Sequence, residues 1–243
     1  MNILERYLTQ EEAIIIVGTG ARPICFCENE DSFTWGIGSS FILNYLGSVF
    51  IVTAKHVIDN QKADHKHIRV LLPDTKMALP ILSGFSPIFY DHENKDDVED
   101  LVFLKVDDSL FCVESGVDLY SWDFIKRSYP ASKLTVGDEL KVAGFPDTGE
   151  RYDYDARKIS DLLLVRTANL SESELGKDIY TMSGQPSNYS FNGISGAPVF
   201  CRRDGWVLFC GIVIRGTAQS GQMHFIGSEI IMSAFKNAGL QKA

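Results

Sequence analysis

The sequence has no apolar run long enough to cross a membrane and no excess of basic charge. None of its apolar stretches approaches the roughly 18 residues that a membrane span needs. The formal net charge is −9, whereas nonspecific binding to nucleic acid or to an anionic membrane requires a basic surface. The composition therefore argues against both a nucleic-acid partner and a membrane partner.

Features of a secreted protein are also missing. Glu5, Glu11 and Glu12 precede a short apolar run near the start of the chain. A secretory signal has the opposite layout, with basic charge first and a longer apolar middle. The five cysteines are odd in number and scattered, which fits reduced thiols. Together these features predict a cytoplasmic protein.

Motifs for metals and nucleotides are weak. Cys25 and Cys27 supply two ligands where a zinc site needs four. The H-x-H pair of His65 and His67 lies among charges without further ligands. The G-x-G motif ahead of Pro23 is not a nucleotide fingerprint, because this proline takes the place of the third glycine. We expect no metal and no cofactor.

What the sequence does contain is a series of short apolar runs rich in β-branched and aromatic residues, separated by Gly, Asn and Asp. Two tight turns stand out, one from Asn44 to Gly47 and one at Asp204-Gly205. Apolar residues make up 45% of the chain and charged residues 23%, which is ordinary for a globular protein. This pattern predicts an all-β sandwich or a pair of barrels.

Helical periodicity is confined to the two ends. Residues 2–12 fit a short helix, and a second helix is expected from Ser228, which could cap it, to Gly239, which would end it. The stretch 110–135 lacks periodicity and contains Pro130. We interpret this stretch as the crossover between two β-rich halves.

The stretch FNGISGAPVF (191–200) places a serine, Ser195, among small residues. A serine hydroxyl is a weak nucleophile and needs an adjacent base. Gly193 and Gly196 permit backbone geometries that are forbidden to bulkier residues. A turn of this kind could point the amides of Gly193 and Ser195 at one spot, as an oxyanion hole requires. The alternative is a polar residue in an ordinary glycine-rich turn.

A candidate base and a candidate acid lie at the ends of two apolar runs. His56 follows the run SVFIVTA almost at once, where a rigid strand end could hold the ring still. Asp100 immediately precedes LVFLKV, so its side chain could turn inward and orient the histidine. Asp96 and Asp97 are the alternative acids.

The order His56, Asp100, Ser195, within the motifs TAKHV, DLVFL and GISGAPV, resembles the chymotrypsin-like (trypsin-like) serine peptidases. WGIGSSFIL, VGDELKVAGFP and GIVIRG also resemble strands of that family, so the resemblance covers most of the chain. It implies two packed antiparallel six-stranded β-barrels with a catalytic triad in the cleft between them. The expected division is an N-terminal helix, a first barrel, a crossover linker, a second barrel and a C-terminal helix, at residues 1–12, 13–115, 116–135, 136–227 and 228–243.

The chain departs from this family at two positions near the nucleophile. IIIVGTG (14–20) looks like the family's activated N-terminus, which pairs with an acid just before the serine, but that position is Ile194 here. We therefore interpret 13–17 as an ordinary strand and expect the oxyanion loop to form without that switch, or to be ordered by substrate or a partner. Ile214 replaces a serine that often supports the triad acid.

By the same resemblance, substrate contacts are expected from Tyr189 at the pocket floor and from Ile214, Arg215 and Gly216. Arg215 and His224 could place positive charge near the cleft, although Arg215 could equally form a surface ion pair.

Three functions follow from these observations. The first is a stand-alone cytoplasmic serine endopeptidase that acts on protein or peptide substrates through an acyl-enzyme. For such an enzyme we expect a regulatory partner protein or narrow selectivity. The second is a catalytically degenerate domain that binds peptides or serves as a scaffold, as Ile194, Ile214 and Tyr189 suggest. An α/β-hydrolase is disfavoured, because Ala197 stands in place of the last glycine of its elbow motif and the helical pattern of a doubly wound sheet is missing.

Overall fold

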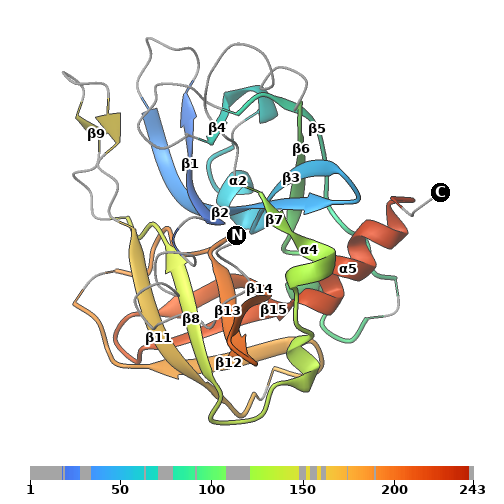
Figure 1. The fold of residues 1–243 in the computed structure, drawn as a ribbon. Coiled ribbons are helices and arrows are strands. Elements are labelled where there is room, and N and C mark those ends of the chain that lie inside the picture. Colours follow the sequence, from blue (N-terminus) through green and yellow to red (C-terminus); the bar gives the residue numbers. More distant parts are fainter. Residues whose placement is uncertain are drawn as a thin grey trace.

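The computed structural model is built from two β-rich halves stacked on one another (Figure 1). It describes residues 18, 20–27, 34–62, 64–70, 79–90, 92–107, 121–147, 152–153, 158–159, 163–173, 175–188 and 190–240. The helix predicted at 2–12 and the strand predicted at 13–17 lie outside these residues. Within the described part of the chain, strands dominate, and the prediction of an all-β fold is confirmed.

The first half is an open sheet. Its strands pair in the order β4-β1-β2-β3-β6-β5, and the short β7 runs parallel to β2. In the described residues β4 and β5 remain edges, so this half is a partly open barrel and differs from the closed barrel that was expected. The strands are β1 (Ala21–Cys27), β2 (Thr34–Tyr45), β3 (Ser48–Thr53), β4 (Ile68–Val70), β5 (Ile81–Phe85), β6 (Val102–Val106) and β7 (Trp122–Asp123).

The second half is a closed six-stranded antiparallel barrel, as predicted. Its strands pair in the order β11-β12-β15-β14-β13-β8, and the ends of this series also pair with each other. They are β8 (Glu139–Gly144), β11 (Leu164–Ser171), β12 (Ile179–Gly184), β13 (Pro198–Arg203), β14 (Trp206–Thr217) and β15 (Gln222–Gly227). A separate hairpin is formed by β9 (Tyr152–Asp153) and β10 (Lys158–Ile159).

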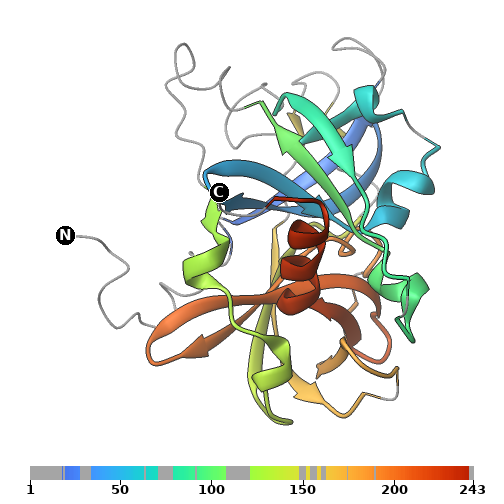
Figure 2. The ribbon, with the colours of Figure 1, turned by 90° about the vertical axis from the view of Figure 1, so that its right-hand side faces the viewer.

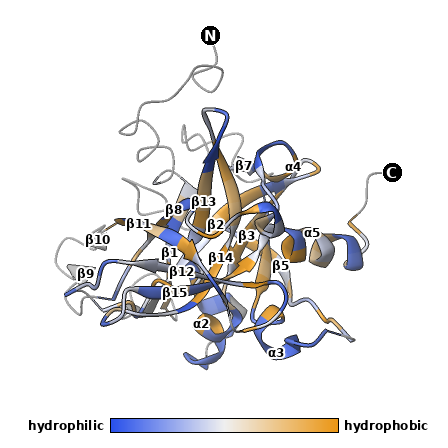
Figure 3. Ribbon diagram, turned by 90° about the horizontal axis from the view of Figure 1, so that it is seen from below, coloured by the Kyte–Doolittle hydropathy of each residue, from blue (hydrophilic) through white to orange (hydrophobic). Residues whose placement is uncertain are grey.

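Both predicted tight turns are confirmed. Leu46 and Gly47 connect β2 to β3, and Asp204 and Gly205 connect β13 to β14. All four residues have positive φ angles (53°, 85°, 50° and 81°). Two-residue loops of this kind match the twist of the flanking strands. The hydropathy colouring shows the corresponding pattern, with hydrophobic strand interiors and hydrophilic connections (Figure 3).

Short helical segments connect and cover the halves. The described part of the predicted crossover contains β7, a short helix and a 3₁₀ turn, so it has more regular structure than expected. The C-terminal helix α5 is present, but Gly227 is its N-cap, and the Ser228 hydroxyl donates to the Tyr129 carbonyl instead of capping the helix. The helical segments are α2 (Lys55–Asp59), η2 (His65–His67), α3 (Lys95–Val98), α4 (Phe124–Arg127), η4 (Ala131–Lys133) and α5 (Ser228–Asn237).

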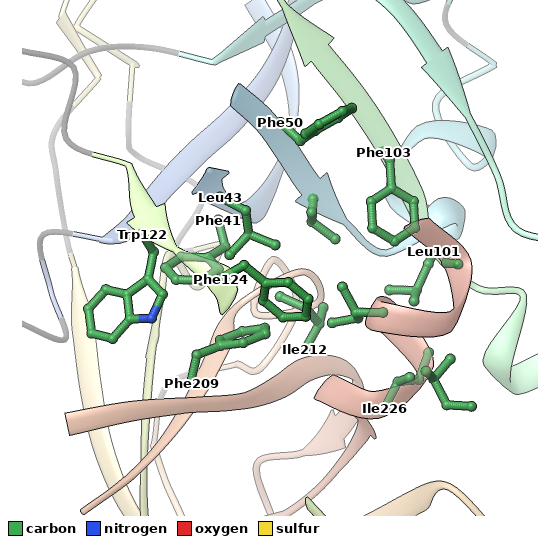
Figure 4. Packing of buried hydrophobic residues seen from close by; sticks show 14 of the residues in the cluster. Phe41, Leu43, Phe50, Leu101, Phe103, Trp122, Phe124, Phe209, Ile212 and Ile226 are labelled. Carbon is green, nitrogen blue, oxygen red and sulfur yellow. The ribbon is translucent and has the colours of Figure 1, made fainter. Parts of the chain in front are cut away.

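Three apolar clusters form the core, one inside each half and one that joins the halves. The joining cluster brings Phe41 of β2 against Phe209 of β14, with stacked rings 4.8 Å apart (Figure 4). Phe235 of α5 enters the same cluster and stacks on Tyr45 at 4.3 Å. Helix α5 lies between the two halves in the side view (Figure 2). Burial of these aromatic rings therefore holds the halves together.

Candidate active site

A cleft of about 490 Å³ lies between the two halves. His56, Asp100 and Gln61 line it from the first half. The second half contributes Asp147, the loop that carries Gly193 and Ser195, and the strand segment Ile214 to Gly216. Folding thus brings residues that are far apart in the sequence to one cavity.

His56 and Asp100 meet because their strands are neighbours. Strands β3 and β6 are antiparallel, with Thr53 opposite Val102, so the residues after β3 and those before β6 share one end of the sheet. His56 lies in α2, directly after β3, rather than on the strand end itself. Its Nδ1 lies 2.7 Å from Asp100 Oδ2, and its backbone N–H donates to Asp100 Oδ1 at 2.9 Å. Both carboxylate oxygens of Asp100 therefore hold this histidine.

The loop that carries Ser195 consists of two successive turns. The Ile194 N–H donates to the Phe191 carbonyl at 3.0 Å, and the Ala197 N–H donates to the Ile194 carbonyl at 2.9 Å. The third residue of each turn is a glycine with positive φ, Gly193 at 84° and Gly196 at 89°. A type II turn requires such an angle at its third residue. A methyl group at Gly196 would also collide with the Ser39 carbonyl oxygen, so glycine is needed there for space as well.

Two amides of this loop are left without an acceptor in the described part of the chain, those of Gly193 and Ser195. The carbonyl of each of their peptide units is engaged. The Asn192 carbonyl accepts from the Asp147 N–H at 2.5 Å, and the Ile194 carbonyl accepts from Ala197. The N–H and C=O of a trans peptide point in opposite directions. Both amides therefore face away from these anchors.

The Ser195 hydroxyl donates to the Ile214 carbonyl at 3.1 Å. Among the described contacts there is no hydrogen bond between Ser195 and His56. The structure thus joins two members of the predicted triad directly and places the third in the same cleft with its hydroxyl turned to another acceptor.

Of the other site residues predicted from the sequence, some line the cleft and others do not. Arg215 lines the cleft and forms a bidentate pair with Asp97, at 2.5 and 3.1 Å, so Asp97 is engaged away from His56. Gly216 lines the cleft beside Phe191, and Tyr189 lies outside the described residues. Ile194 is 1% exposed and offers no carboxylate.

His224 was expected near the cleft as a source of positive charge, but it is not among the residues that line it. It lies on β15 and contacts the Thr181 hydroxyl through Nδ1 at 3.0 Å. Burial lowers the pKa of His224, and the positive charge of Arg215 lowers it further. The ring is therefore a weaker source of positive charge than an ordinary histidine.

Ser39 is the residue near this loop that sequence reasoning missed. It is fully buried on β2, and its backbone N–H donates to the Ser195 carbonyl at 3.0 Å. Its hydroxyl donates to the Gly193 carbonyl at 2.7 Å. The available signal was a serine just before the apolar run Phe41 to Leu43, because a hydroxyl that is buried with such a run is nearly always hydrogen-bonded.

Residues suited to metals or thiol chemistry are dispersed. No group of three His, Cys, Asp or Glu side chains converges within the described residues. The four described cysteines, Cys25, Cys27, Cys201 and Cys210, are buried free thiols. Burial raises the pKa of Cys25 to about 12, which makes this thiol a poor nucleophile. In the described chain, the longest apolar helix falls short of what a membrane span needs.

Comparison with known proteins finds likeness in structure only. No family model matches the chain, and no curated protein matches it in sequence. The Rv3671c protease of M. tuberculosis in its active form is 14% identical, with a TM-score of 0.55 over 95% of this chain and 85% of that chain. A serine-to-alanine mutant of Rv3671c in an inactive form is 13% identical, with a TM-score of 0.57 over 96% and 93% of the two chains. The chain therefore has the chymotrypsin-like two-barrel fold.

Proposed function

We propose that this chain is a serine endopeptidase. Ser195 would be the nucleophile, His56 its general base and Asp100 the acid that orients the histidine. The observation that carries the proposal is the double hold of Asp100 on His56, at 2.7 Å and 2.9 Å, in a cleft that Ser195 also lines. In this arrangement Nδ1 would carry the proton that faces Asp100, and Nε2 would be left to accept one.

For reaction, the Ser195 hydroxyl would rotate about its Cα–Cβ bond from the Ile214 carbonyl toward His56. The hydrogen bond to this carbonyl, at 3.1 Å, is an ordinary neutral one, so substrate binding could exchange it at small cost. His56 would then take the hydroxyl proton as Ser195 attacks the peptide carbonyl. The histidine would give that proton to the leaving amine, and water would hydrolyse the acyl-enzyme.

The amides of Gly193 and Ser195 are the proposed oxyanion hole. Support comes from their lack of an acceptor among the described residues and from the anchored carbonyls on the opposite side of each peptide unit. Donors held in this way need no reorganisation when negative charge develops on the substrate oxygen.

Substrate would run along the segment Ile214 to Gly216, which lines the cleft at the edge of the closed barrel. An extended peptide can add to such an edge through its main chain. Arg215 lines this path, but its guanidinium is engaged by Asp97, which is the ion-pair alternative. Arg215 therefore stays a predicted substrate contact, as the sequence resemblance implies. Tyr189 remains a predicted pocket residue.

The experiment that tests the proposal combines labelling with cleavage mapping. The wild type should react with a fluorophosphonate probe and cut peptides at sites that mass spectrometry identifies. The Ser195→Ala variant, equally folded, should do neither. Wild-type protein that takes no label would contradict the proposal.

A catalytically degenerate peptide-binding module is the second candidate. The observation that favours it is the Ser195 hydroxyl bond to the Ile214 carbonyl, which leaves the nucleophile unpaired with its base. Such a module would bind peptides in the same cleft without turnover, and the Ser195→Ala variant would bind them as well as the wild type.

A further inference from the structure

Four successive peptide units make up the loop from Asn192 to Gly196, and every one of them is anchored. The 192–193 and 194–195 units are held through their carbonyls by Asp147 and Ala197, and these are the units that carry the two free amides. In the 193–194 and 195–196 units both the N–H and the C=O are engaged. Ser39 is the donor in both hydrogen bonds to the carbonyls of these two units.

Ser39 reaches this loop from the other half of the molecule. Its hydroxyl donates to the Gly193 carbonyl at 2.7 Å and its N–H donates to the Ser195 carbonyl at 3.0 Å. The two carbonyls flank Ile194, whose side chain is buried in the apolar core of the closed barrel. Hydrogen bonds from the neutral Ser39 therefore hold this loop, because Ile194 cannot form the ion pair that an acid at its position would form.

Ser39 itself has little freedom. Its hydroxyl oxygen accepts from the Phe145 N–H at 2.8 Å, and its carbonyl accepts from the Thr53 hydroxyl at 2.7 Å. Both Ser39 and Thr53 are fully buried. Because every polar group of Ser39 is engaged, its position is determined by β2, β3 and the segment after β8 together.

We infer that Ser39 is a positioning residue, which presets the backbone around Gly193 and Ser195 so that their amides are aimed without cleavage of the chain and without a partner. This inference rests on the proposed function, since it assigns the ordering of the proposed oxyanion hole. The Ser39 side chain acts on the loop through the Gly193 carbonyl and does not touch the substrate.

The Ser39→Ala variant removes the hydroxyl and leaves both the Gly193 carbonyl and the Phe145 N–H without their partner. The matched control is Ser40→Ala. Ser40 is the next residue on the same strand, equally buried, and its hydroxyl donates to the Arg22 carbonyl, away from the loop. Ser39→Cys keeps the shape of the side chain with a weaker donor.

Two measurements separate positioning from mere support of the fold. The first is kcat and KM on a peptide obtained from cleavage mapping. The second compares the affinity of a peptide aldehyde, whose adduct with Ser195 carries an oxyanion, with that of the same peptide ending in a carboxamide. We expect Ser39→Ala to lower kcat by about 10- to 100-fold with little change in KM. Its affinity for the aldehyde should fall and that for the carboxamide should stay. The kcat and the aldehyde affinity of Ser39→Cys should lie between those of Ser39→Ala and those of the wild type. Ser40→Ala should match the wild type in both.

A folded Ser39→Ala variant with wild-type kcat and aldehyde affinity would overturn the inference, as would an equal loss in Ser40→Ala. If Ser39→Ala fails to fold, an unchanged kcat in Ser39→Cys overturns it. A wild type that neither cleaves peptides nor binds the aldehyde contradicts the proposed function and, with it, the role of Ser39.

Discussion

The two halves of the molecule hold their proposed catalytic residues in different ways. Ser195 is held mainly through the main chain of the closed barrel, with two turns, two glycines of positive φ and a series of backbone hydrogen bonds, to which the Ser39 hydroxyl of the other half adds one bond. The open half holds His56 through one side chain, since Asp100 bonds both the ring and the backbone N–H of the histidine. A loop held by its main chain tolerates most changes of its side chains, but it has no room for extra atoms at its glycines. The position of His56, in contrast, depends on the single residue Asp100.

The halves also differ in what makes them stable. The strands of the closed barrel pair in a ring around their own apolar cluster. The open sheet is covered by a helix from outside the sheet. Phe235 of α5 packs against Phe50 and Phe103 of its strands, with ring centroids 5.0 and 4.9 Å apart. Packing of β3 and β6 therefore depends on a helix that is far from them in the sequence.

The largest effect should come from Asp100→Asn, which keeps the shape of the side chain and removes its charge. An asparagine can present an N–H to the ring, which favours the wrong tautomer of His56, and it no longer stabilises the imidazolium. We expect kcat to fall by on the order of 10⁴-fold, a loss known for this exchange in the serine peptidase triad. Asp96→Asn, on an exposed neighbour in α3, is the control and should keep wild-type kcat. Similar losses in both variants would show that the charge of the whole loop matters, not the acid that holds His56.

The second prediction concerns the glycines of the closed half. Gly196→Ala adds a methyl group that would collide with the Ser39 carbonyl and the Thr53 hydroxyl, at a φ of 89°. We expect the free energy of unfolding to fall by about 5 kcal/mol, as measured by urea denaturation. Gly137→Ala is the control, since its φ is 94° but nothing lies within 4 Å of the added methyl group. It should lose only about 1–2 kcal/mol from the left-handed backbone. Equal losses would mean that the backbone angle alone sets the requirement for glycine.

Sequence patterns predicted the closed half better than the open one. Short apolar runs, the Asp204-Gly205 turn and the glycines around Ser195 are local signals, and the structure reproduces the strands and turns that they predict. The open edges of the first half depend on which distant strands pair, and local patterning carries no information about that. Ser228 shows a similar limit, because its hydroxyl is drawn to Tyr129, 99 residues away in the chain, and not to the helix end.

In the candidate active site, too, the features that depend on local sequence were predictable and those that depend on distant segments were not. The position of Asp100 just before an apolar strand favoured it over Asp96 and Asp97, and the structure places its carboxylate 2.7 Å from the His56 ring. The hydrogen bond of Ser195 to Ile214 and the two bonds from Ser39 could not be foreseen, because they connect segments whose proximity is a result of barrel packing. Burial of a hydroxyl can be guessed from a sequence, whereas its partner cannot.

The third prediction tests how far the open half depends on its external support. Phe235 is fully buried and contacts rings from both β3 and β6. Phe235→Ala should lower the free energy of unfolding by about 3–5 kcal/mol, through lost burial and the cavity that remains. Ile125→Ala, at a side chain that is 50% exposed on α4, should change it by less than about 0.5 kcal/mol. A single unfolding transition in urea is expected for both variants, because one apolar cluster joins the halves. Two separate transitions in Phe235→Ala would show that the halves are stable independently.

The smallest effect is a pH dependence of stability at His224, which lies on β15 and is influenced by Arg215 and Asp97. Burial, and after it Arg215, lowers the pKa of His224 in the folded state, and Asp97 opposes this shift. Below its unfolded pKa of about 6.5 the unfolded chain therefore binds more protons at this site than the folded chain. The free energy of unfolding should fall as the pH drops through 6.5 and level off below the lowered folded pKa. Urea denaturation of the wild type and His224→Gln at pH 7.5 and 5.0 measures this, since the two proteins differ only at this side chain. The loss on acidification should be smaller in His224→Gln, and an equal loss in both would mean that protonation of His224 does not couple to unfolding.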